Sequence, residues 1–449
     1  MQDNNLFVII ATFFWLSYVP IAFISLYRVV TNRKIFVKKH AKRVQKDAAI
    51  IFQITTRSAT TTDVVRRGIL SIVTSAHKAN FDNYSISVVT DDREDILTLR
   101  DLKCEVVVVD RDFRTNAIRK GRALQYAVEH RRRTGQNTSK YWIFHMDDES
   151  YVTPQTILAS LKSIEEGDEV AFEGPIFYPL KFESANRLTA IAESIRPFAC
   201  YDCVSQMTNP PPLHMHGSNL LVRSDVEDTI GWNFGPTLAE DQMFGFKVFE
   251  KYGPGSMGWH GGILLEQPPL NIRDHFFQRR RWVLGTLQNS EKFPRLHRFK
   301  LLYKSVTYAL GFVSAMASTA LTIYNNIPAI ASLWDYAVLS QNIAMFSEHF
   351  SLHRLAEITP VEIGTATILM FTTLVWLGSY QMGLFLNLRY SQMSWRRRLY
   401  LHVQTLFFSP LIGLVETFPA LWATIEYYRD KKKEAREKVP VYDFYVVNK

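Results

Sequence analysis

Cysteine is scarce in this 449-residue chain, which has only Cys104, Cys200 and Cys203. So few cysteines cannot build a disulfide framework, and a reducing, cytoplasmic environment therefore fits the soluble part of the protein. Cys200 and Cys203 have CxxC spacing. No second pair and no histidine partner follows at the spacing of a zinc site, so we predict no structural metal there.

Charge is absent from several long stretches. Leu6–Tyr27 has none over 22 residues, and as a helix such a segment spans roughly 33 Å, enough for the core of a bilayer. The start of the chain lacks the basic region of a signal peptide and no small-residue cleavage site follows, so we interpret this segment as a retained anchor. Later apolar segments are Ser305–Trp334, Ile363–Leu388 and a third, Leu399–Tyr428, which is interrupted by Pro410, Glu416 and Pro419.

Acidic residues are absent from Arg28–Lys46, which holds eight lysines and arginines directly after the first apolar segment. The positive-inside rule therefore places this flank and the following domain in the cytoplasm. Trp395–Arg398 and Arg429–Lys438 are also basic and predicted inside, whereas Asp335–Glu357 has a net negative balance and is predicted outside. Because both flanks of Leu399–Tyr428 would then be cytoplasmic, we predict a re-entrant hairpin or an interfacial helix pair there.

The formal net charge of +9 has its source in these basic runs. Because the runs flank apolar spans, they indicate membrane lipids rather than nucleic acid as partner. With 47% hydrophobic and 13% aromatic residues, the chain has enough apolar surface for both a soluble core and a membrane part. We expect four parts: an anchor with its basic flank at 1–46, a soluble domain at 47–299, membrane helices at 300–428 (two spans plus the re-entrant or interfacial segment) and a cytoplasmic tail at 429–449.

Hydrophobic periodicity alternates between strand and helix within the soluble domain. Strands are predicted at 49–57, 84–92, 104–110 and 141–149, and helices at 61–78 and 118–133. Such alternation is typical of an α/β fold with a mostly parallel sheet. In these sheets ligands bind beyond the carboxyl ends of the strands. Residues predicted at those ends are Arg57, Asp91, Asp92, Asp147, Asp148 and Glu149.

The acidic triplet Asp147, Asp148 and Glu149 ends an apolar strand. Adjacent carboxylates repel one another, so a positive partner is expected. Ligands that are all oxygen suit a hard cation such as Mg²⁺ or Mn²⁺, which leaves room for a substrate diphosphate. The other interpretation is that the triplet caps the helix that opens at Thr153 and Pro154. A cap needs one side chain rather than three, so we favour the metal site.

Two later stretches add to this site. In "LAEDQMFGF", Glu240 and Asp241 follow a Gly-Pro loop and precede an amphipathic run, which predicts carboxylates at the start of a helix. "HFFQRRRWVLG" places Gln278, Arg281 and Trp282 on one helix face, as a diphosphate and a sugar ring would require. The alternative for this second stretch is a basic helix on the membrane surface. His260, in "GWHGG", is a further candidate metal ligand, although a lone histidine beside glycines is more often structural.

In this order, the motifs resemble those of the family 2 inverting glycosyltransferases with a GT-A fold, the group that includes the cellulose and hyaluronan synthases. They are most similar to the Egghead-type β-1,4-mannosyltransferases of animals. The matching motifs are TTR at Thr55–Arg57, VVTD at Val88–Asp91, RTNAIRKGRALQY at Arg114–Tyr126, HMDDES at His145–Ser150, AED at Ala239–Asp241, QRRRW at Gln278–Trp282 and FYVVNK at Phe444–Lys449. The last one also resembles the FxVTxK gating loop of cellulose synthase. The membrane spans match more weakly.

The resemblance implies a Rossmann-like GT-A domain and roles for individual residues. Asp241 would be the general base of a single inverting displacement. Asp147 and Glu149 would bind the metal, Mg²⁺ or Mn²⁺. The nucleotide-sugar would be bound by Thr56, Arg57, Asp91, Lys120, Asp147, Asp148 and Lys449. The acceptor and the leaving diphosphate would be bound by Gly217, Ser218, Glu240, Gln278, Arg281 and Trp282.

The function implied is transfer of mannose from GDP-mannose, in a β-linkage, to a lipid-linked saccharide or glycolipid. The enzyme would be a multi-pass membrane protein with a cytoplasmic catalytic domain, in the plasma membrane of a prokaryote or in the ER or Golgi of a eukaryote. One alternative is a processive UDP-sugar-dependent polysaccharide synthase, which the small number of spans disfavours. The other is an inactive, membrane-anchored nucleotide-sugar-binding protein, which the presence of Asp241 and QRRRW disfavours.

Overall fold

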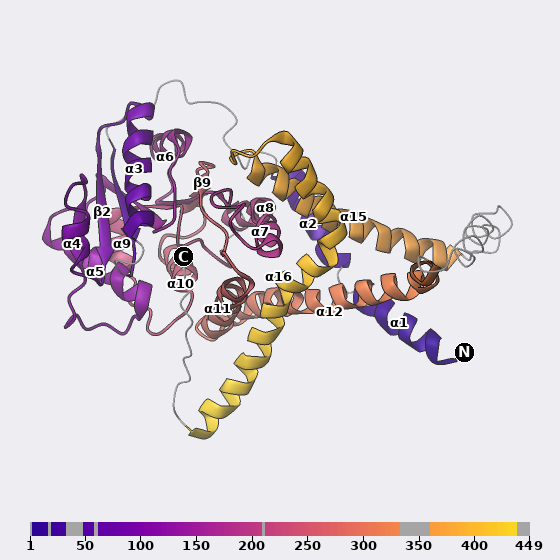
Figure 1. Cartoon of the computed structure of the whole chain (residues 1–449). Coiled ribbons are helices and arrows are strands. Elements are labelled where there is room, and N and C mark those ends of the chain that lie inside the picture. Colours follow the sequence, from indigo (N-terminus) through magenta and orange to yellow (C-terminus); the bar gives the residue numbers. More distant parts are fainter. Residues whose placement is uncertain are drawn as a thin grey trace.

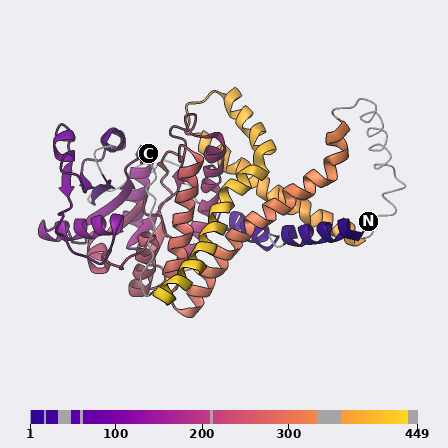
Figure 2. The ribbon, with the colours of Figure 1, turned by 60° about the horizontal axis from the view of Figure 1, so that its bottom comes forward.

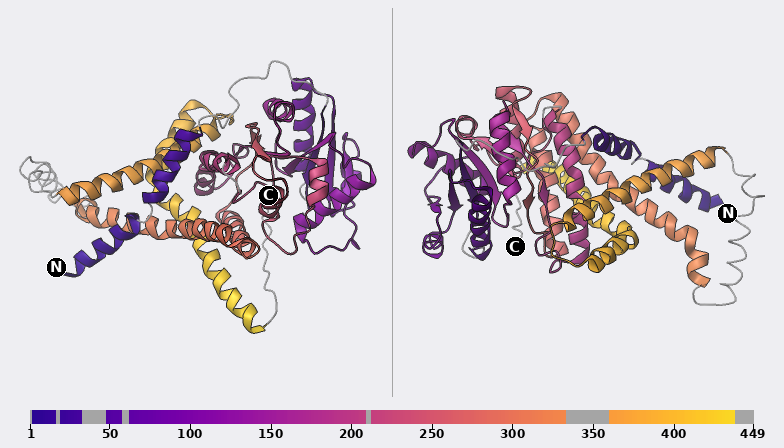
Figure 3. Two further views of the ribbon diagram at one scale, coloured as in Figure 1. Left: turned by 180° about the vertical axis from the view of Figure 1, so that it is seen from behind. Right: turned by 90° about the horizontal axis from the view of Figure 1, so that it is seen from above.

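The computed structural model describes residues 2–16, 19–32, 48–57, 62–208, 212–332 and 360–437. A domain built on a β-sheet occupies one end of the molecule (Figure 1). Helices α1 (Gln2–Leu16), α12 (Arg295–Ser332) and α15 (Pro360–Leu388) extend together from the other end, as the views in Figure 3 also show. The sheet and these three helices therefore lie at opposite ends of the described part of the molecule.

The main sheet has seven strands in the order β3-β2-β1-β4-β7-β5-β8. Its strands are β1 (Ala49–Thr55), β2 (Tyr84–Thr90), β3 (Glu105–Val108), β4 (Tyr141–Asp147), β5 (Ala171–Glu173), β7 (Leu220–Arg223) and β8 (Met257–Trp259). β7 runs antiparallel to β4 and β5, and every other pair is parallel. Two short strands, β6 (Ile176–Phe177) and β9 (Leu264–Leu265), pair separately. The expected α/β fold with a mostly parallel sheet is confirmed.

Helices cover both faces of the sheet, and this explains why its central strands are almost continuously apolar. Ile50, Phe52 and Ile54 of β1 belong to a core cluster that also contains residues of α3 and α6. Ile51 points to the other face, where residues of α5, α9 and α10 complete a second cluster. These helices are α3 (Thr62–Ala79), α5 (Arg119–Arg133), α6 (Pro154–Glu166), α9 (Ser224–Ile230) and α10 (Glu240–Tyr252), and a short α4 (Asp95–Thr98) precedes β3.

Strand register brings the predicted ligand-binding ends together. Thr55 of β1 lies opposite Val89 of β2 on one side and Asp147 of β4 on the other. The residues that follow these strands therefore emerge at one edge of the sheet. Helix α6 is capped by Thr153, whose side chain accepts a hydrogen bond from the backbone N–H of Thr156. The acidic triplet is not that cap, so its charge needs another explanation.

Further helices pack between the sheet and the apolar part of the chain or continue into that part. They are α7 (Arg187–Glu193), α8 (Arg196–Thr208), α11 (Ile272–Ser290) and α16 (Trp395–Glu437). α16 packs against α12, α11 and α7, and it bends along its length (Figure 2). An α2 helix (Val19–Thr31) follows α1 near the start of the chain and packs against α8 and α15.

Three helices are long and apolar enough to cross a membrane, judged on the described residues: Thr12–Thr31, Thr367–Leu388 and Trp395–Lys432. The first and second overlap predicted spans. The predicted span at 305–334 falls on α12 and on residues outside the described part, so it stays a prediction. For 399–428 we predicted a re-entrant hairpin or an interfacial helix pair. The break between two helices is wrong, because one continuous helix contains both Pro410 and Pro419, and the interfacial position stays a prediction. A helix packed against neighbours tolerates proline because those neighbours satisfy the freed backbone groups.

Candidate active site

Lys120 is at the centre of the site. It lies in the first turn of α5 and forms an ion pair with Asp147 at the end of β4. Its Nζ also donates to the Gly217 carbonyl at 3.1 Å. Burial lowers the pKa of Lys120, but the carboxylates of Asp147, Glu240 and Asp241 outweigh this effect and leave the pKa above its usual value. Part of the positive charge expected beside the acidic triplet is thus a lysine.

Gly217 provides the close approach between Lys120 and Asp241. A Cβ atom at this position would lie 3.0 Å from Asp241 Oδ2 and 3.2 Å from Lys120 Nζ, so a larger residue would push one of them aside. Next in the chain, the Ser218 hydroxyl accepts from the Asp147 backbone N–H at 3.2 Å. Gly217 and Ser218, which were predicted to bind the acceptor, therefore contact Lys120 and Asp147, which were predicted to bind the donor.

Asp147, Glu149 and Glu266 form a cluster whose carboxylate oxygens lie within 4.8 Å of one another. Glu266 accepts hydrogen bonds from the Ser150 and Ser218 hydroxyls at 2.9 and 2.8 Å. An all-oxygen donor set fits Mg²⁺ or Mn²⁺. Asp148 lies outside this cluster and accepts instead from the Thr56 hydroxyl at 3.1 Å. The expectation of two ligands, Asp147 and Glu149, missed Glu266.

His260 does not join this cluster in the described part of the chain. Its ring lies in a tight space, since a Cβ atom on Gly174 would be 2.3 Å from His260 Cε1. The Nδ1 atom accepts from the Gly262 backbone N–H at 3.1 Å. Burial lowers the pKa of His260 to about 4, so the ring is neutral. His260 therefore serves the packing of the loop, the structural role that its glycine neighbours suggested.

Asp91, at the end of β2, faces two arginines. Arg122 of α5 lies 3.2 Å from its Oδ1, and Arg57 adds a favourable charge from the end of β1. Burial nevertheless raises the pKa of Asp91, and the arginines only partly oppose the rise. Arg122 was not among the predicted site residues. It lies two residues after Lys120 within the RTNAIRKGRALQY motif, and that position is the signal that could have identified it.

Glu240 and Asp241 begin α10, as predicted. Burial and the Asp241 charge raise the pKa of Glu240 to about 7. Burial also raises the pKa of Asp241, while Lys120, the Gln242 backbone N–H and Arg281 oppose the rise. The Gln242 backbone N–H donates to Asp241 Oδ1 at 2.8 Å. Glu240 is therefore readily protonated near neutral pH, which leaves Asp241 as the candidate proton acceptor.

The three arginines of QRRRW have different surroundings. Arg281 is exposed and lies close enough to Glu240 and Asp241 to lower their pKa values. Arg279 and Arg280 are buried and form ion pairs with Glu416 and Glu426 of α16. Gln278, Arg281 and Trp282 were predicted to share one helix face at the site. Of these three, only Arg281 is connected by its charge to Glu240 and Asp241.

Trp282 lies close to two guanidinium groups. The Cζ atoms of Arg196 and Arg279 are each 4.3 Å from its ring. Gln278 accepts from Arg279 Nη1 at 3.3 Å. Cation–π contacts of this kind hold an indole in one orientation. The acceptor-binding roles of Gln278 and Trp282 stay predictions.

A buried charge network joins α11 to its neighbours. Arg279 lies 2.9 Å from Glu193 Oε1 of α7 and 2.8 Å from Glu416 Oε1 of α16. His275 lies 3.2 Å from a carboxylate oxygen of each glutamate. The Tyr308 hydroxyl of α12 donates to Glu416 Oε1 at 2.5 Å. The helix that carries Arg281 is thus fixed to the C-terminal helices by charge as well as by apolar packing.

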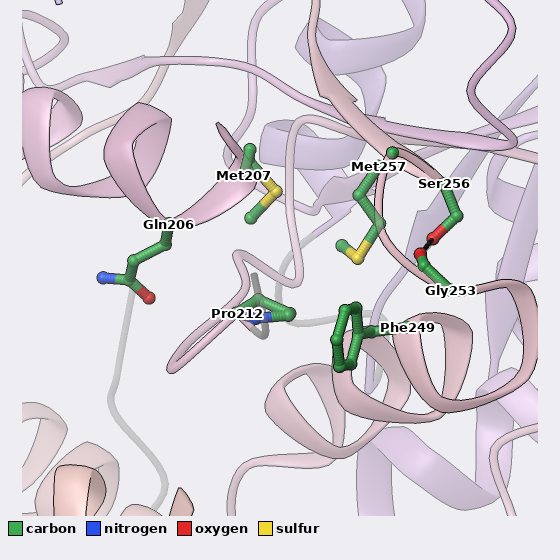
Figure 4. Close-up of a pocket in the computed structure, with 8 residues that line it drawn as sticks. Gln206, Met207, Pro212, Phe249, Gly253, Ser256 and Met257 are labelled. Carbon is green, nitrogen blue, oxygen red and sulfur yellow. Dashed lines mark hydrogen bonds between the residues drawn. The ribbon is translucent and has the colours of Figure 1, made fainter. Parts of the chain in front are cut away.

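A small hollow lies near the end of α8 and the start of β8 (Figure 4). It has no room for a water molecule. Its lining residues are Gln206, Met207, Pro212, Phe249, Gly253, Gly255, Ser256 and Met257. None of them is a predicted site residue. Lys449 and the FYVVNK motif lie outside the described residues.

Comparison with known proteins finds the profile described as glycosyl transferase family group 2 over residues 142–377. The β-1,4-mannosyltransferase egh of Drosophila melanogaster is 26% identical over 259 residues, 56% of this chain and 56% of its own length. The β-1,4-mannosyltransferase bre-3 of Caenorhabditis elegans is 26% identical over 253 residues, 55% of this chain and 54% of its own length. The chain thus spans about half the length of the curated relatives it matches.

Among solved structures, the mannosyltransferase PcManGT from Pyrobaculum calidifontis, in complex with GDP-Man and Mn²⁺, has a TM-score of 0.46 and 13% sequence identity. The superposition covers 82% of this chain and 98% of that chain.

Proposed function

Because the chain belongs to glycosyl transferase family group 2, we propose that it transfers mannose from GDP-mannose to a lipid-linked saccharide or glycolipid and forms a β-linkage. Its fold is the expected GT-A class, with a mostly parallel sheet and a helical region after it. The observation that carries the proposal is the convergence of Lys120, Asp147, Gly217 and Asp241 at the carboxyl ends of the strands. Mannose is proposed because both relatives above are named β-1,4-mannosyltransferases.

Asp241 is the proposed general base. It takes the proton of an acceptor hydroxyl, whose oxygen attacks the anomeric carbon from the face opposite the nucleoside diphosphate. The configuration inverts, and no covalent sugar intermediate is needed. Lys120 and Arg281 place positive charge near the two carboxylates of α10, and Arg281 is exposed to an incoming substrate. Their charges stabilise the diphosphate as negative charge develops on it.

Asp147, Glu149 and Glu266 would hold the divalent cation. When bound, Mg²⁺ or Mn²⁺ supplies positive charge against the leaving diphosphate. Asp91 and Arg57 are proposed to contact the nucleotide, and Thr56 orients Asp148 through its hydroxyl. We also propose that the sheet domain is cytoplasmic and that the protein crosses the membrane more than once, supported by the basic flank at 28–46 and the three candidate spans.

The donor test uses purified protein in detergent with sugar-labelled GDP-mannose or UDP-sugars, with Mg²⁺ or Mn²⁺ and a membrane lipid extract as the source of acceptor. We expect GDP release from GDP-mannose and transfer of the label into the organic phase. Release only from a UDP-sugar, with label in a high-mass polymer, would establish the processive synthase instead. If no donor is turned over, the protein is a binding protein.

Glu149→Gln is expected to abolish the metal-dependent part of donor binding, because an amide is a much poorer ligand for a hard cation than a carboxylate. Calorimetric titration with GDP-mannose, with and without Mn²⁺, measures this effect. Asp148→Asn is the matched control, since Asp148 is adjacent in sequence but bonds to Thr56 outside the carboxylate cluster. If both variants lost the Mn²⁺-dependent part of donor binding equally, the assignment of Glu149 as a metal ligand would be wrong.

Glu240→Gln is expected to leave the acidic limb of the pH profile of kcat/KM nearly in place. A base is active only when ionised, so its activity falls as the pH drops through its pKa, and the raised pKa of Asp241 places this fall above the usual aspartate range. Burial and the Asp241 charge raise the pKa of Glu240 to about 7, so Glu240 takes up its proton while Asp241 is still ionised. Glutamine resembles this protonated, uncharged Glu240, so its effect on the titration of Asp241 should be small. A limb that disappears together with the activity at every pH would identify Glu240 as the base.

A further inference from the structure

A second cluster of metal-binding side chains lies outside the proposed donor site. It consists of Glu173 at the end of β5, Cys203 of α8, and His214 and His216 in the segment before β7. One potential ligand atom from each residue lies within 4.8 Å of those of the other three. Cys203 Sγ is 3.1 Å from His214 Nε2 and 3.7 Å from His216 Nε2. Glu173 is fully buried and Cys203 nearly so.

The donor atoms differ in kind from those of the carboxylate cluster. A thiolate and imidazole nitrogens are borderline-soft ligands that favour Zn²⁺, whereas Mg²⁺ and Mn²⁺ favour oxygen. Tetrahedral Zn²⁺ with Zn–S of about 2.3 Å and Zn–N of about 2.0–2.1 Å separates sulfur from nitrogen by roughly 3.5 Å. The two distances from Cys203 lie on either side of that value. The cluster is thus nearly the size of a zinc site.

Glu173 is the fourth member of the cluster and a candidate ligand itself. Its Oε1 accepts from the His216 backbone N–H at 2.7 Å. The same oxygen lies 2.8 Å from His216 Nδ1, but this contact lacks the geometry of a hydrogen bond. The second oxygen of Glu173, Oε2, is buried and has no hydrogen-bond partner among the described residues. A buried carboxylate oxygen of this kind is available to a metal ion.

We propose that Cys203 Sγ, His214 Nε2, a ring nitrogen of His216 and a carboxylate oxygen of Glu173 bind a structural Zn²⁺. The ion would fix the segment that leads directly into Gly217 and Ser218 on the acceptor side of the active site. Gln206 already holds the same segment, because its Oε1 accepts from the backbone N–H groups of Leu213 and His214 (Figure 4 shows Gln206 beside this segment).

The charges around the cluster are compatible with this assignment. Burial, Lys304 and His216 keep the pKa of His214 well below its usual value, so its imidazole is neutral, the form that binds metals. Burial raises the pKa of the Cys203 thiol, so Zn²⁺ would displace its proton on binding. Lys304 Nζ lies 3.3 Å from His214 Nδ1 and 3.2 Å from Asp202. Zinc-bound His214 carries its proton on Nδ1, so Lys304 would pair with Asp202 alone.

The sequence interpretation found no zinc site because Cys203 was considered with Cys200 as a CxxC pair. The Cys200 Sγ points elsewhere and lies 3.6 Å from the Arg196 carbonyl oxygen. The histidines follow Cys203 after 11 and 13 residues, at no spacing typical of zinc motifs. Cys200 therefore provides a matched control on the same helix.

The first experiment measures zinc by mass spectrometry in untagged, full-length protein after dialysis. We expect about one zinc ion per chain in the wild-type protein and in Cys200→Ser, and a several-fold lower content in Cys203→Ser and His214→Ala. Wild-type protein with no more zinc than Cys203→Ser, or Cys200→Ser with an equal loss, would overturn the proposal.

The second experiment needs no variant, so misfolding cannot obscure it. Wild-type protein is treated with an alkylating reagent in a mild denaturant, either with Zn²⁺ or after a zinc-selective chelator, and modification of each cysteine is followed by peptide mass spectrometry. Zinc should slow alkylation of Cys203 at least tenfold and leave Cys200 and Cys104 unchanged. Equal protection of Cys203 and Cys200 would contradict the site.

Discussion

Asp241→Asn is expected to lower turnover by on the order of 10²-fold or more, because an amide cannot take the proton of the acceptor hydroxyl. Donor binding should remain close to normal. Asparagine keeps the size of the side chain and an oxygen that can accept from the Gln242 backbone N–H, so the start of α10 is preserved. Single-turnover transfer from labelled GDP-mannose and calorimetric donor binding measure the two quantities separately.

Arg281→Ala is the comparison for this variant. Arg281 lies near the same carboxylates, but it cannot act as the base. Its loss should therefore lower turnover without removing the acidic limb of the pH profile. If Asp241→Asn instead weakens donor binding and leaves near-normal turnover, the base is another group. Glu240 is then the first candidate, because its carboxylate is adjacent and its pKa of about 7 is suited to proton transfer.

Arg279→Ala is expected to destabilise the folded protein by about 3–5 kcal/mol, because it leaves buried carboxylates without their cation. Arg279 is 1% exposed and lies between Glu193 and Glu416. Its attraction holds the pKa of Glu193 at about 2 despite complete burial, which alone would raise it. Thermal unfolding of the protein in detergent, at fixed detergent and lipid concentration, measures the change.

Arg281→Ala again serves as the control, because an exposed residue two positions further along the same helix should change stability by no more than about 0.5 kcal/mol. Combining Arg279→Met with Glu193→Gln and Glu416→Gln removes the buried charges together and should restore much of the lost stability. If the Arg279→Ala variant unfolds at the same temperature as the Arg281→Ala variant, the buried charge network does not stabilise the fold.

Local patterns were sufficient for strands β1 to β4 and for helices α3 and α5 of the sheet domain. The run from Ala49 to Thr55 is apolar and ends in polar residues, and it is a buried strand with its polar end at the site. Glu240 and Asp241 start a helix where the sequence places two acids before an amphipathic run. These features depend on residues within one turn or one strand of each other, so they can be inferred without knowing the fold.

The third carboxylate of the oxygen cluster could not be inferred in this way. Glu266 is far from Asp147 in the chain, and it arrives beside Ser150 because Tyr151 and Leu265 form an isolated antiparallel bridge. No sequence pattern around Glu266 predicts that bridge. The same holds for Cys203 and His214, which meet because α8 and the segment before β7 pack together.

The resemblance of the ordered motifs to those of family 2 glycosyltransferases was enough to indicate the family. The fold class and the strand ends that face the substrate could be predicted because they depend on short-range periodicity and residue type. The helical spacing of QRRRW also selected Arg281 for the site, but only the tertiary structure decided what Arg279 and Arg280 contact. Arg279, Arg280 and Arg281 are equivalent as letters, but successive residues on a helix point about 100° apart. The packing of α16 against α11 buries the first two with Glu416 and Glu426, and leaves Arg281 at the carboxylates of α10.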